Sequence, residues 1–483
     1  MRVMLRYGEL TLKSRPVRNA FTARLASNIR DALSRQANGM FHVEREWSRT
    51  YIELEDPQGL DILTRIFGIS SLSVVETVAL DSKDQLADIA AERFAPFVAG
   101  RRFAVRVRRT GVHPFRSQDL AGAIGGRLVH LGKVDLTHPE IEVHVEVRNE
   151  QASLFTESSA APGGMPLGAE HPVLALVSGG FDSMVATWRM MKRGCPVHFL
   201  FCTLGGKAHE LSALRVIKHL CDRWSYGYEP KLHIVDFAPI LEELQREVRP
   251  EMWSVILKRQ FLRAGERICR RRHLPAMITG DAVGQVSSQT IINLSMIQSA
   301  TSCLVLRPLL GMDKNEILAE ARRIGTFDLS SRVREYCGLT ARHARTRARQ
   351  EEVTAAEAHL DFTLVDRQVD AARVLDVLDM TLELEDQISS LEVDVPPSGA
   401  EILDIRLPAE IEAWEIHGAR IIGPGEVLAY LGGQPAWREF VLVCENGNVS
   451  ADVAVELREQ GLNALSIRGG AAGWRRRLRA EPQ

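Results

Sequence analysis

The fold prediction starts from Val173-Leu-Ala-Leu-Val177, which runs directly into Ser178-Gly-Gly-Phe-Asp-Ser183. Five consecutive apolar residues are typical of a buried strand, and the residues that follow, to about Arg193, have the pattern of a helix. Two glycines at such a turn let the backbone approach a phosphate, and the helix start offers free N–H groups and a positive dipole end. The stretch therefore predicts a phosphate-binding loop. The alternative is a glycine-rich turn with a capping Asp/Ser pair, which the complete six-residue pattern makes the weaker interpretation.

The polar side chains of this loop indicate which phosphate chemistry to expect. Asp182 either caps the helix or holds a Mg²⁺ ion that bridges pyrophosphate oxygens, and Ser178 and Ser183 supply hydroxyl donors to the same oxygens. The Walker pattern G-x-x-x-x-G-K-[ST] is absent, so transfer of a γ-phosphoryl group is not implied. No G-x-G-x-x-G follows the strand, so a dinucleotide-binding fold has no support.

The regions around the loop predict several domains. Further buried strands at Val197–Leu200, Lys231–Val235 and Ala276–Thr279, separated by helical segments, are typical of a doubly wound parallel sheet. The first 160 residues alternate short strands and helices, which predicts small α+β units. After an acidic helical span, 350–390, the linker Val395-Pro-Pro-Ser-Gly399 leads to a final α/β unit. The strands predicted in that unit are 402–405, 419–422, 441–444 and 464–467.

Length and composition exclude several classes of protein. At 483 residues the chain has about three times the length of a typical domain, and 45% hydrophobic with 25% charged residues excludes a wholly disordered or fibrous chain. No run of 18 apolar residues is present, so no membrane span is expected. The start, Met1–Arg6, places charge where a signal peptide needs apolar residues, so the cytosol is the expected location. The seven cysteines never form C-x-x-C, which argues against a disulfide framework or a cysteine-rich zinc site.

Charge is distributed unevenly along the chain. Residues 1–50 carry ten Arg and Lys against four Asp and Glu, whereas residues 351–400 carry two against thirteen. A basic amino-terminal block suits nucleic-acid binding, and a solvated basic helix face explains it equally well. The side chains predicted to hold an RNA backbone are Lys13, Arg15, Arg18, Arg101, Arg102, Arg106, Arg108 and Arg109. For the arginines of the strand near residue 106, charge that keeps an edge strand soluble remains the alternative.

The six-residue loop resembles the PP-loop of ATP pyrophosphatases, which adenylate a carbonyl oxygen and release pyrophosphate. Within that group the chain resembles the tRNA 4-thiouridine synthetase family (the ThiI family of tRNA uridine 4-sulfurtransferases) over nearly its whole length. The stretches that carry the resemblance are 178–183, 193–198, 204–210, 255–259, 279–290, 307–309, 312–314, 325–326 and 335–338. The domains that the resemblance implies are a ferredoxin-like domain (1–60), a THUMP RNA-binding domain (61–165), a doubly wound PP-loop adenylation domain (166–390) and a rhodanese-like sulfurtransferase domain (398–483).

The resemblance also implies an ATP site. It places Leu176 and Val177 beside the adenine, and makes Lys314 a phosphate-facing or transition-state cation that is catalytic together with Asp182. The other ATP contacts that it implies are Ser178, Gly179, Gly180, Ser183, Lys258, Gly280 and Gln289. Without the resemblance, Lys258 and Lys314 would be interpreted as surface lysines, and 287–289 as a loop with helix-capping hydroxyls.

Cys444 ends an apolar strand and is followed by Glu445-Asn-Gly-Asn-Val-Ser450 and a predicted helix. Such a turn directs backbone N–H groups and a helix dipole at the sulfur, which favours the thiolate; the alternative is an inert buried cysteine. The stretches that resemble a rhodanese domain, whose loop cysteine carries a persulfide, are 402–410, 417–419, 447–450 and 469–474. Val449 stands where an arginine is common, which favours a protein persulfide over thiosulfate as sulfur donor. Ser450 stands where a C-x₅-R phosphatase needs its arginine, which excludes that class.

Cys337 lies in Arg334-Glu-Tyr-Cys-Gly-Leu-Thr340, flanked by Arg332, Arg342 and Arg345. Neighbouring guanidinium groups favour both a thiolate and bound phosphate, and a loop cysteine in a basic patch is the alternative. The match at Glu-Tyr-Cys-Gly implies that Cys337 is the resolving cysteine. The other five cysteines are interpreted as structural.

Together these expectations describe an ATP-consuming transferase that converts uridine 8 of tRNA to 4-thiouridine. ATP with Mg²⁺ adenylates the C4 oxygen, a Cys444 persulfide supplied by an IscS-like cysteine desulfurase attacks C4, and Cys337 attacks the bridging sulfur. Sulfur transfer to the carrier protein ThiS for thiamine thiazole synthesis is expected as a second role. The alternatives are a sulfur carrier for thiamine synthesis only, which needs Cys444 but not Cys337, and a non-catalytic RNA-binding protein. The oligomeric state stays open, with a homodimer as one alternative.

Overall fold

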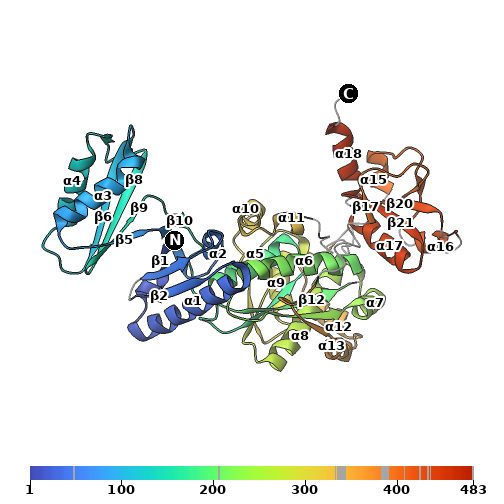
Figure 1. Ribbon diagram of the computed structural model, residues 1–483. Coiled ribbons are helices and arrows are strands. Elements are labelled where there is room, and N and C mark those ends of the chain that lie inside the picture. Colours follow the sequence, from blue (N-terminus) through green and yellow to red (C-terminus); the bar gives the residue numbers. More distant parts are fainter. Residues whose placement is uncertain are drawn as a thin grey trace. The chain divides into compact units, whose positions relative to one another are not determined.

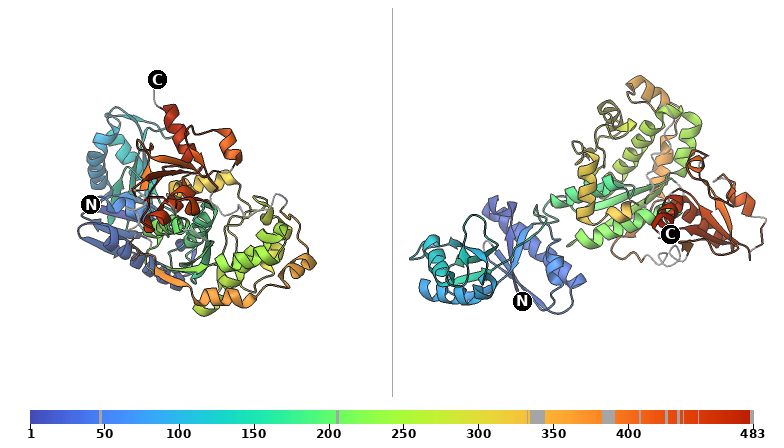
Figure 2. Two further views of the ribbon diagram at one scale, coloured as in Figure 1. Left: turned by 90° about the vertical axis from the view of Figure 1, so that its right-hand side faces the viewer. Right: turned by 90° about the horizontal axis from the view of Figure 1, so that it is seen from above.

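The structure is a computed structural model. It describes residues 1–46, 49–204, 207–331, 333, 344–381, 391–406, 408–423, 426–431, 434–435, 437–445 and 447–480. The chain divides into two compact units, residues 1–170 with 192–194, and residues 171–191 with 195–483. The described residues form four sheets, which Figures 1 and 2 show together with their helices.

The first sheet is antiparallel throughout, in the order β10-β4-β1-β3-β2. Its strands are β1 (Arg2–Tyr7), β2 (Phe41–Arg45), β3 (Arg49–Leu54), β4 (Ile69–Val74) and β10 (Ser159–Ala160), and its helices are α1 (Arg15–Gln36) and α2 (Gly59–Leu63). Val3, Met4 and Leu5 of the central strand are fully buried. Since β4 pairs with β1, this sheet continues past the domain boundary predicted at residue 60.

The second sheet has the order β5-β9-β8-β6-β7. Its strands are β5 (Glu76–Ala79), β6 (Arg102–Thr110), β7 (Lys133–Val134), β8 (Ile141–Arg148) and β9 (Gln151–Phe155), and its helices are α3 (Lys83–Val98) and α4 (Ser117–Leu128). Phe94 of α3, Phe103 of β6 and Ile124 of α4 belong to one buried cluster, so the apolar faces of the two helices and the strand form the core. Ser82 accepts a hydrogen bond from the backbone N–H of Gln85 and thereby caps α3.

The third sheet contains the predicted phosphate loop and has the order β15-β14-β11-β12-β13-β16. Its strands are β11 (Val173–Val177), β12 (Val197–Thr203), β13 (Lys231–Asp236), β14 (Ala276–Ile278), β15 (Leu304–Leu306) and β16 (Arg373–Asp376). The first five pair in parallel, which confirms the doubly wound sheet predicted from the sequence. The helices are α5 (Phe181–Lys192), α6 (Lys207–Trp224), α7 (Ala238–Glu247), α8 (Trp253–Arg272), α9 (Ile291–Gln298), α10 (Lys314–Ile324), α11 (Phe327–Ser330), α12 (Gln350–Glu357) and α13 (Phe362–Asp370). Helices α5 and α6 lie on one face of the sheet and α8 on the other (Figure 1).

The sequence predicts that the acidic span 350–390 is helical throughout, and this prediction is wrong. It contains α12 and α13, but β16 then pairs antiparallel with β13 at the edge of the sheet, and residues 382–390 lie outside the described part. An ion pair between Lys231 and Asp376 joins the two strands. The acidic composition predicted a solvated helix. The residues of β16 form a strand because they pair with the open edge of β13, which exists only in the folded sheet.

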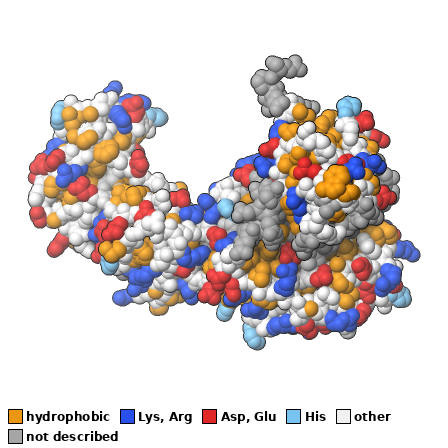
Figure 3. Space-filling view, turned by 45° about the vertical axis from the view of Figure 1, so that its right-hand side comes forward, with side chains coloured by type: hydrophobic (Ala, Val, Ile, Leu, Met, Phe, Trp, Pro, Cys, Tyr) orange, Lys and Arg blue, Asp and Glu red, His pale blue; other side chains and the backbone are white. Residues whose placement is uncertain are grey.

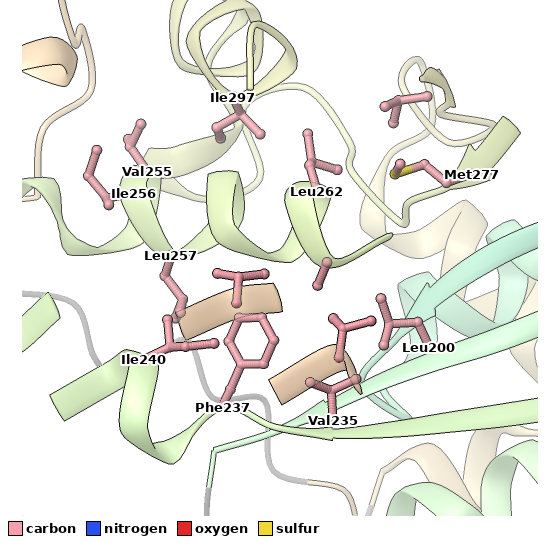
Figure 4. Packing of buried hydrophobic residues seen from close by; sticks show 14 of the residues in the cluster. Leu200, Val235, Phe237, Ile240, Val255, Ile256, Leu257, Leu262, Met277 and Ile297 are labelled. Atoms are coloured by element: carbon pink, nitrogen blue, oxygen red, sulfur yellow. The ribbon is translucent and has the colours of Figure 1, made fainter. Parts of the chain in front are cut away.

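One hydrophobic core of this domain lies between the sheet and α8. Figure 4 shows Phe237, which follows β13, between Val235 of the strand and Leu257 of α8. All three side chains are at most 7% exposed. Because α8 is anchored by this cluster, the polar residues that it carries elsewhere are held at fixed positions relative to the sheet.

The fourth sheet is parallel throughout, in the order β17-β21-β20-β18-β19. Its strands are β17 (Glu392–Val393), β18 (Glu401–Asp404), β19 (Arg420–Ile421), β20 (Glu439–Val443) and β21 (Asn463–Ile467), and its helices are α15 (Pro408–Ala413), α16 (Val427–Leu431), α17 (Asn448–Glu459) and α18 (Gly470–Ala480). A parallel α/β unit is therefore present at the carboxyl-terminal end, as predicted. Within it, Arg406 is fully buried on Asp404, with Nη2 2.6 Å from a carboxylate oxygen.

No helix in the described part of the chain is both long enough and apolar enough to cross a membrane.

Candidate active site

A cavity of about 700 Å³ opens at the carboxyl ends of β11 and β12. In doubly wound sheets this edge is where ligands bind, because neighbouring crossovers diverge there. The predicted nucleotide contacts that line the cavity are Leu176, Val177, Ser178, Gly180, Asp182, Ser183, Lys258, Gly280 and Gln289. Apolar side chains that include Leu200, Leu257 and Phe261 form another part of its wall. The cavity thus combines an apolar wall with the phosphate loop, as a nucleotide requires.

The loop from Ser178 to Ser183 is closed by its own hydroxyl groups. The Ser178 hydroxyl accepts from the N–H of Gly180 at 3.4 Å, and the Ser183 hydroxyl donates to the carbonyl of Gly180 at 3.1 Å. Gly179 has φ +80°, and a Cβ there would lie 2.8 Å from the Cα of Ala213 in α6. Only glycine fits both the backbone conformation and the space, so Gly179 shapes the loop from behind.

Gly280 brings the end of β14 against the start of α5. A Cβ at this position would lie 2.7 Å from the backbone carbon of Asp182 and 2.7 Å from the nitrogen of Ser183. The close approach of backbone to backbone is what places Asp182 and Ser183 beside the cavity.

We expect Gly280→Ala to weaken ATP binding, because the methyl group pushes the start of α5 away from β14. Such overpacking costs about 1–3 kcal/mol in the free energy of unfolding. Equilibrium binding of ATP and urea unfolding measure the two effects. Gly311→Ala is the matched control, because a Cβ at residue 311 meets no atom within 4 Å. Equal ATP affinity in both variants would contradict the prediction.

Asp182 is paired with the predicted catalytic lysine. The Lys314 ammonium lies 2.9 Å and 3.2 Å from the two carboxylate oxygens, and the side-chain amide of Gln285 donates to the same carboxylate at 3.0 Å. Lys314 is the first residue of α10, whose start is fixed by a capping box between Asp313 and Glu316. The structure thus brings Asp182 and Lys314 together at the loop, although they are 132 residues apart.

Asp281 is a site residue that sequence reasoning did not single out. It is 6% exposed, and its carboxylate accepts from Lys258 at 2.9 Å and from the Thr279 hydroxyl at 2.7 Å, with Arg307 at 3.4 Å. Burial alone raises the pKa of this carboxyl group, but Lys258, Thr279 and Arg307 more than compensate and lower the pKa to about 2. Asp281 therefore stays ionised and fixes the direction of Lys258. The signal in the sequence is its place after Gly280 at a strand end.

We expect Asp281→Asn to lower the free energy of unfolding by about 2 kcal/mol at pH 7, since the native pKa of about 2 lies below the ordinary value of 3.8. A depressed native pKa stabilises the fold above the unfolded-state pKa. The difference between the two proteins should therefore hold above about pH 5 and disappear as the pH falls from 3.8 towards 2. Urea unfolding of both proteins across this range measures it.

The same variant should raise the KM for ATP, because Lys258 loses the partner that orients it. Asp366→Asn is the control, since this carboxylate also pairs with an arginine, Arg267, but is 51% exposed. A pH-independent difference between wild type and Asp281→Asn would contradict the assignment.

Two residues that line the cavity each have a polar atom without a hydrogen-bond partner in the described part of the chain. The Ser254 hydroxyl and the Gln289 side-chain carbonyl are buried and have no hydrogen-bond partner within the described residues. Buried polar groups are rarely left unpaired. A nucleotide would supply hydrogen-bonding groups to these two atoms. Its negative charge would suit the glycine-lined loop and the two lysines, Lys314 beside Asp182 and Lys258 beside Asp281.

Cys444 follows β20 and is only 3% exposed. Its sulfur accepts from the backbone N–H of Ser450 at 3.3 Å and lies 3.3 Å from the Ser450 hydroxyl, which in turn is 2.8 Å from Ser466. Helix α17 begins at Asn448, so Ser450 lies in its first turn. The sulfur thus faces the start of a helix, where negative charge is stabilised.

Cys337 lies outside the described residues, as do Arg334 and the rest of 334–343. Its predicted role as resolving cysteine therefore stays a prediction.

The predicted RNA-facing arginines of the second sheet are partly neutralised. Arg102 pairs with Asp135 and Glu140, and Arg106 lies 2.7 Å from Glu142. Arg101 and Arg108 are exposed. On the face of the molecule in Figure 3, basic and acidic side chains are interspersed. The net positive charge that this sheet offers to a polyanion is therefore smaller than its number of arginines suggests.

Comparison with known proteins covers nearly the whole chain. Residues 168–362 match the family described as thiamine biosynthesis protein (ThiI), residues 2–73 its ferredoxin-like domain, and residues 81–157 the THUMP domain. A tRNA sulfurtransferase of Pyrobaculum aerophilum is 38% identical over 96% of both chains. The protein belongs to the ThiI family of tRNA sulfurtransferases. A second tRNA sulfurtransferase, from Yersinia enterocolitica, is 33% identical over 95% of this chain and 98% of its own length.

A ThiI-family fold is also found among solved structures. A 4-thiouridine synthetase in complex with RNA and bound ATP is 27% identical, with a TM-score of 0.68, over 77% of this chain and 98% of that one. The protein PH1313 of Pyrococcus horikoshii shares the fold, with a TM-score of 0.53 over 67% of this chain and 99% of its own. These comparisons confirm the predicted family, the ferredoxin-like, THUMP and PP-loop domains, and the enzyme class, a transferase.

Proposed function

We propose that this protein uses ATP to replace the C4 oxygen of a tRNA uridine, uridine 8, with sulfur. The observation that carries the proposal is the cavity at β11 and β12, which collects the residues expected to bind ATP in a chain that belongs to the tRNA sulfurtransferases. Support comes from the similar 4-thiouridine synthetase, whose structure contains RNA and ATP.

The ATP would lie with its base against the apolar wall near Leu176 and its phosphates at the loop Ser178–Ser183. Lys258 and Lys314 would neutralise charge that develops on the departing pyrophosphate. Asp182 is the carboxylate suited to hold a Mg²⁺ ion that also binds phosphate oxygens, because Mg²⁺ at nucleotide sites takes one or two protein carboxylates and completes its shell with phosphate and water. The Asp182 carboxylate would then contact both Lys314 and the metal ion.

Activation of the uridine is needed because oxide or hydroxide is a poor leaving group. Transfer of AMP to the C4 oxygen, with release of pyrophosphate, makes that oxygen part of a good leaving group. The sulfane sulfur of a Cys444 persulfide then attacks C4, and AMP departs. Cys337 attacks the bridging sulfur, which leaves sulfur on the base and a disulfide between Cys337 and Cys444. A reductant must restore the two thiols before the next cycle.

Cys444 is suited to carry the sulfur because the Ser450 N–H donates to it and the Ser450 hydroxyl oxygen lies 3.3 Å away. Since Cys444 is 3% exposed, a sulfur donor can reach it only after the structure around it moves. Val449 at the position where rhodaneses often have arginine suits a protein donor, an IscS-like cysteine desulfurase, better than anionic thiosulfate.

The direct test is mass spectrometry of tRNA nucleosides after incubation of the full chain with tRNA, ATP, Mg²⁺, a cysteine desulfurase and cysteine. We expect 4-thiouridine at position 8, and none when ATP is left out. Thiolation that continues without ATP would overturn the proposal, and so would ATP-dependent thiolation at another position only.

A second role, sulfur delivery to the carrier protein ThiS for thiazole synthesis, is favoured by the description of the matching family as a thiamine biosynthesis protein. It would need Cys444 but not Cys337. In a strain that lacks its own copy, we expect the Cys337→Ser variant to support growth without thiazole, and the Cys444→Ser variant to fail.

A further inference from the structure

Two of the cysteines interpreted as structural lie next to each other. Cys269 is near the end of α8, and Cys303 directly precedes β15. Their thiols lie close enough that each affects the pKa of the other. The Cys269 sulfur lies 3.8 Å from the carbonyl oxygen of Ala276, and the Cys303 sulfur lies 4.0 Å from that of Pro275, the preceding residue. Both sulfurs thus meet at the start of β14.

The two thiols differ in how solvent reaches them. Cys269 is 2% exposed and belongs to the core between α8 and the sheet, whereas Cys303 packs against the same core but is partly exposed. A small oxidant in solution can therefore reach Cys303, and Cys269 lies directly behind it. This is the arrangement of an accessible cysteine with a resolving partner.

We propose that Cys269 and Cys303 form a reversible disulfide when the protein meets a low-molecular-weight disulfide such as oxidised glutathione. The Cys303 thiolate attacks one sulfur of the oxidant and releases one thiolate of it. Cys269 then loses its proton and attacks the Cys303 sulfur, which releases the second. The two protein thiols are oxidised, one S–S bond forms, and the oxidant is reduced to two thiols.

The surroundings make this reaction slow at neutral pH. Burial raises the pKa of both thiols, and the nearby Glu266 carboxylate adds to the effect, while Arg270 opposes it at Cys303. Both groups are therefore protonated in the reduced protein, and the dithiol persists unless oxidising conditions are sustained. The pair is thus separate from the cysteines that we propose to cycle during sulfur transfer.

The bridge would join elements that carry the ATP site. Helix α8 carries Lys258, β14 leads to Asp281, and β15 leads to Arg307, three side chains that form one ion-pair network. A bond between residues 269 and 303 closes a loop of about 35 residues that contains Asp281. Oxidation should therefore stabilise this domain against unfolding and restrain one wall of the cavity.

The test uses the full chain, incubated with oxidised or reduced glutathione at pH 8, alkylated and digested without reduction. We expect a peptide pair linked between Cys269 and Cys303, and a thermal midpoint about 5 °C higher in the oxidised sample. Cys303→Ser should abolish both effects, and Cys221→Ala, at a buried cysteine of α6, should change neither.

Two results would overturn the proposal. One is Cys303 that remains joined to glutathione with Cys269 still free. The other is a thermal shift of equal size in the Cys303→Ser variant. Because neither the peptide pair nor the midpoint depends on tRNA or ATP turnover, failure here leaves the proposed sulfur transfer untouched.

Discussion

Cys444→Ser should abolish formation of 4-thiouridine while leaving ATP-dependent pyrophosphate release largely intact. A serine hydroxyl cannot carry a sulfane sulfur, so the loss should exceed about 1,000-fold, as expected when a covalent nucleophile is removed. The ATP cavity is lined by residues of the PP-loop domain, and Cys444 is not among them. Nucleoside mass spectrometry and a pyrophosphate assay on the same reaction measure both quantities.

Cys337→Ser should give the same two results but differ in a third. Here the Cys444 persulfide can still be loaded by the desulfurase, so radioactive sulfur from labelled cysteine should remain on the protein. The Cys444→Ser variant should carry no such label. The control is Cys221→Ala, which removes a fully buried thiol of α6. Loss of pyrophosphate release in both active-site variants would refute the separation of adenylation from sulfur transfer.

The buried position of Cys444 makes the movement of its loop a condition of this scheme. Gly470 packs so closely on the loop that a Cβ there would lie 2.3 Å from the carbonyl oxygen of Cys444 and 2.3 Å from the nitrogen of Gly447. Arg406, which is fully buried on Asp404, also reaches Glu445 at 3.6 Å. The backbone at Cys444 and Gly447 is therefore tightly packed, so access to the sulfur requires a movement that involves these contacts.

The sequence predicted best what depends on local pattern. Val173–Val177 reads as a buried strand because all five residues are apolar, and the structure has β11 at the same residues. The sequence also predicted the phosphate-binding loop from its glycines, because the turn itself requires their backbone conformation and their spacing. Family resemblance, and no local pattern, is what made Lys258 and Lys314 predicted site residues and not surface lysines.

Features that depend on distant partners were missed. Asp281 enters the candidate site through its contacts with Lys258 and Arg307, which are 23 and 26 residues away and meet it only in the folded domain. Strand β16 exists because β13 offers an open edge, and its own residues carry no strong strand pattern. The proximity of Cys269 and Cys303 likewise arises only in the folded domain, where α8 and β15 both pack against β14.

Asp182→Asn should have the opposite effect to Cys444→Ser: pyrophosphate release should fall by about 100-fold or more, while sulfur loading of Cys444 continues. The asparagine keeps the shape of the side chain but removes the charge that would hold Mg²⁺ and that now pairs with Lys314. Folding should survive, because Lys314 is 38% exposed and such a pair adds at most about 1 kcal/mol to stability.

The Lys314→Met variant distinguishes two explanations for the lower pyrophosphate release expected of Asp182→Asn. If Asp182 only holds the lysine in place, the two variants should be equally impaired and the double variant no worse. If Asp182 also binds the metal, Asp182→Asn alone should require a higher Mg²⁺ concentration for half-maximal rate, and we expect this result. Asp328→Asn, at an exposed carboxylate in the first turn of α11, is the control and should match the wild type. Thiolation at the wild-type rate in Asp182→Asn would remove the basis for placing ATP activation at this loop.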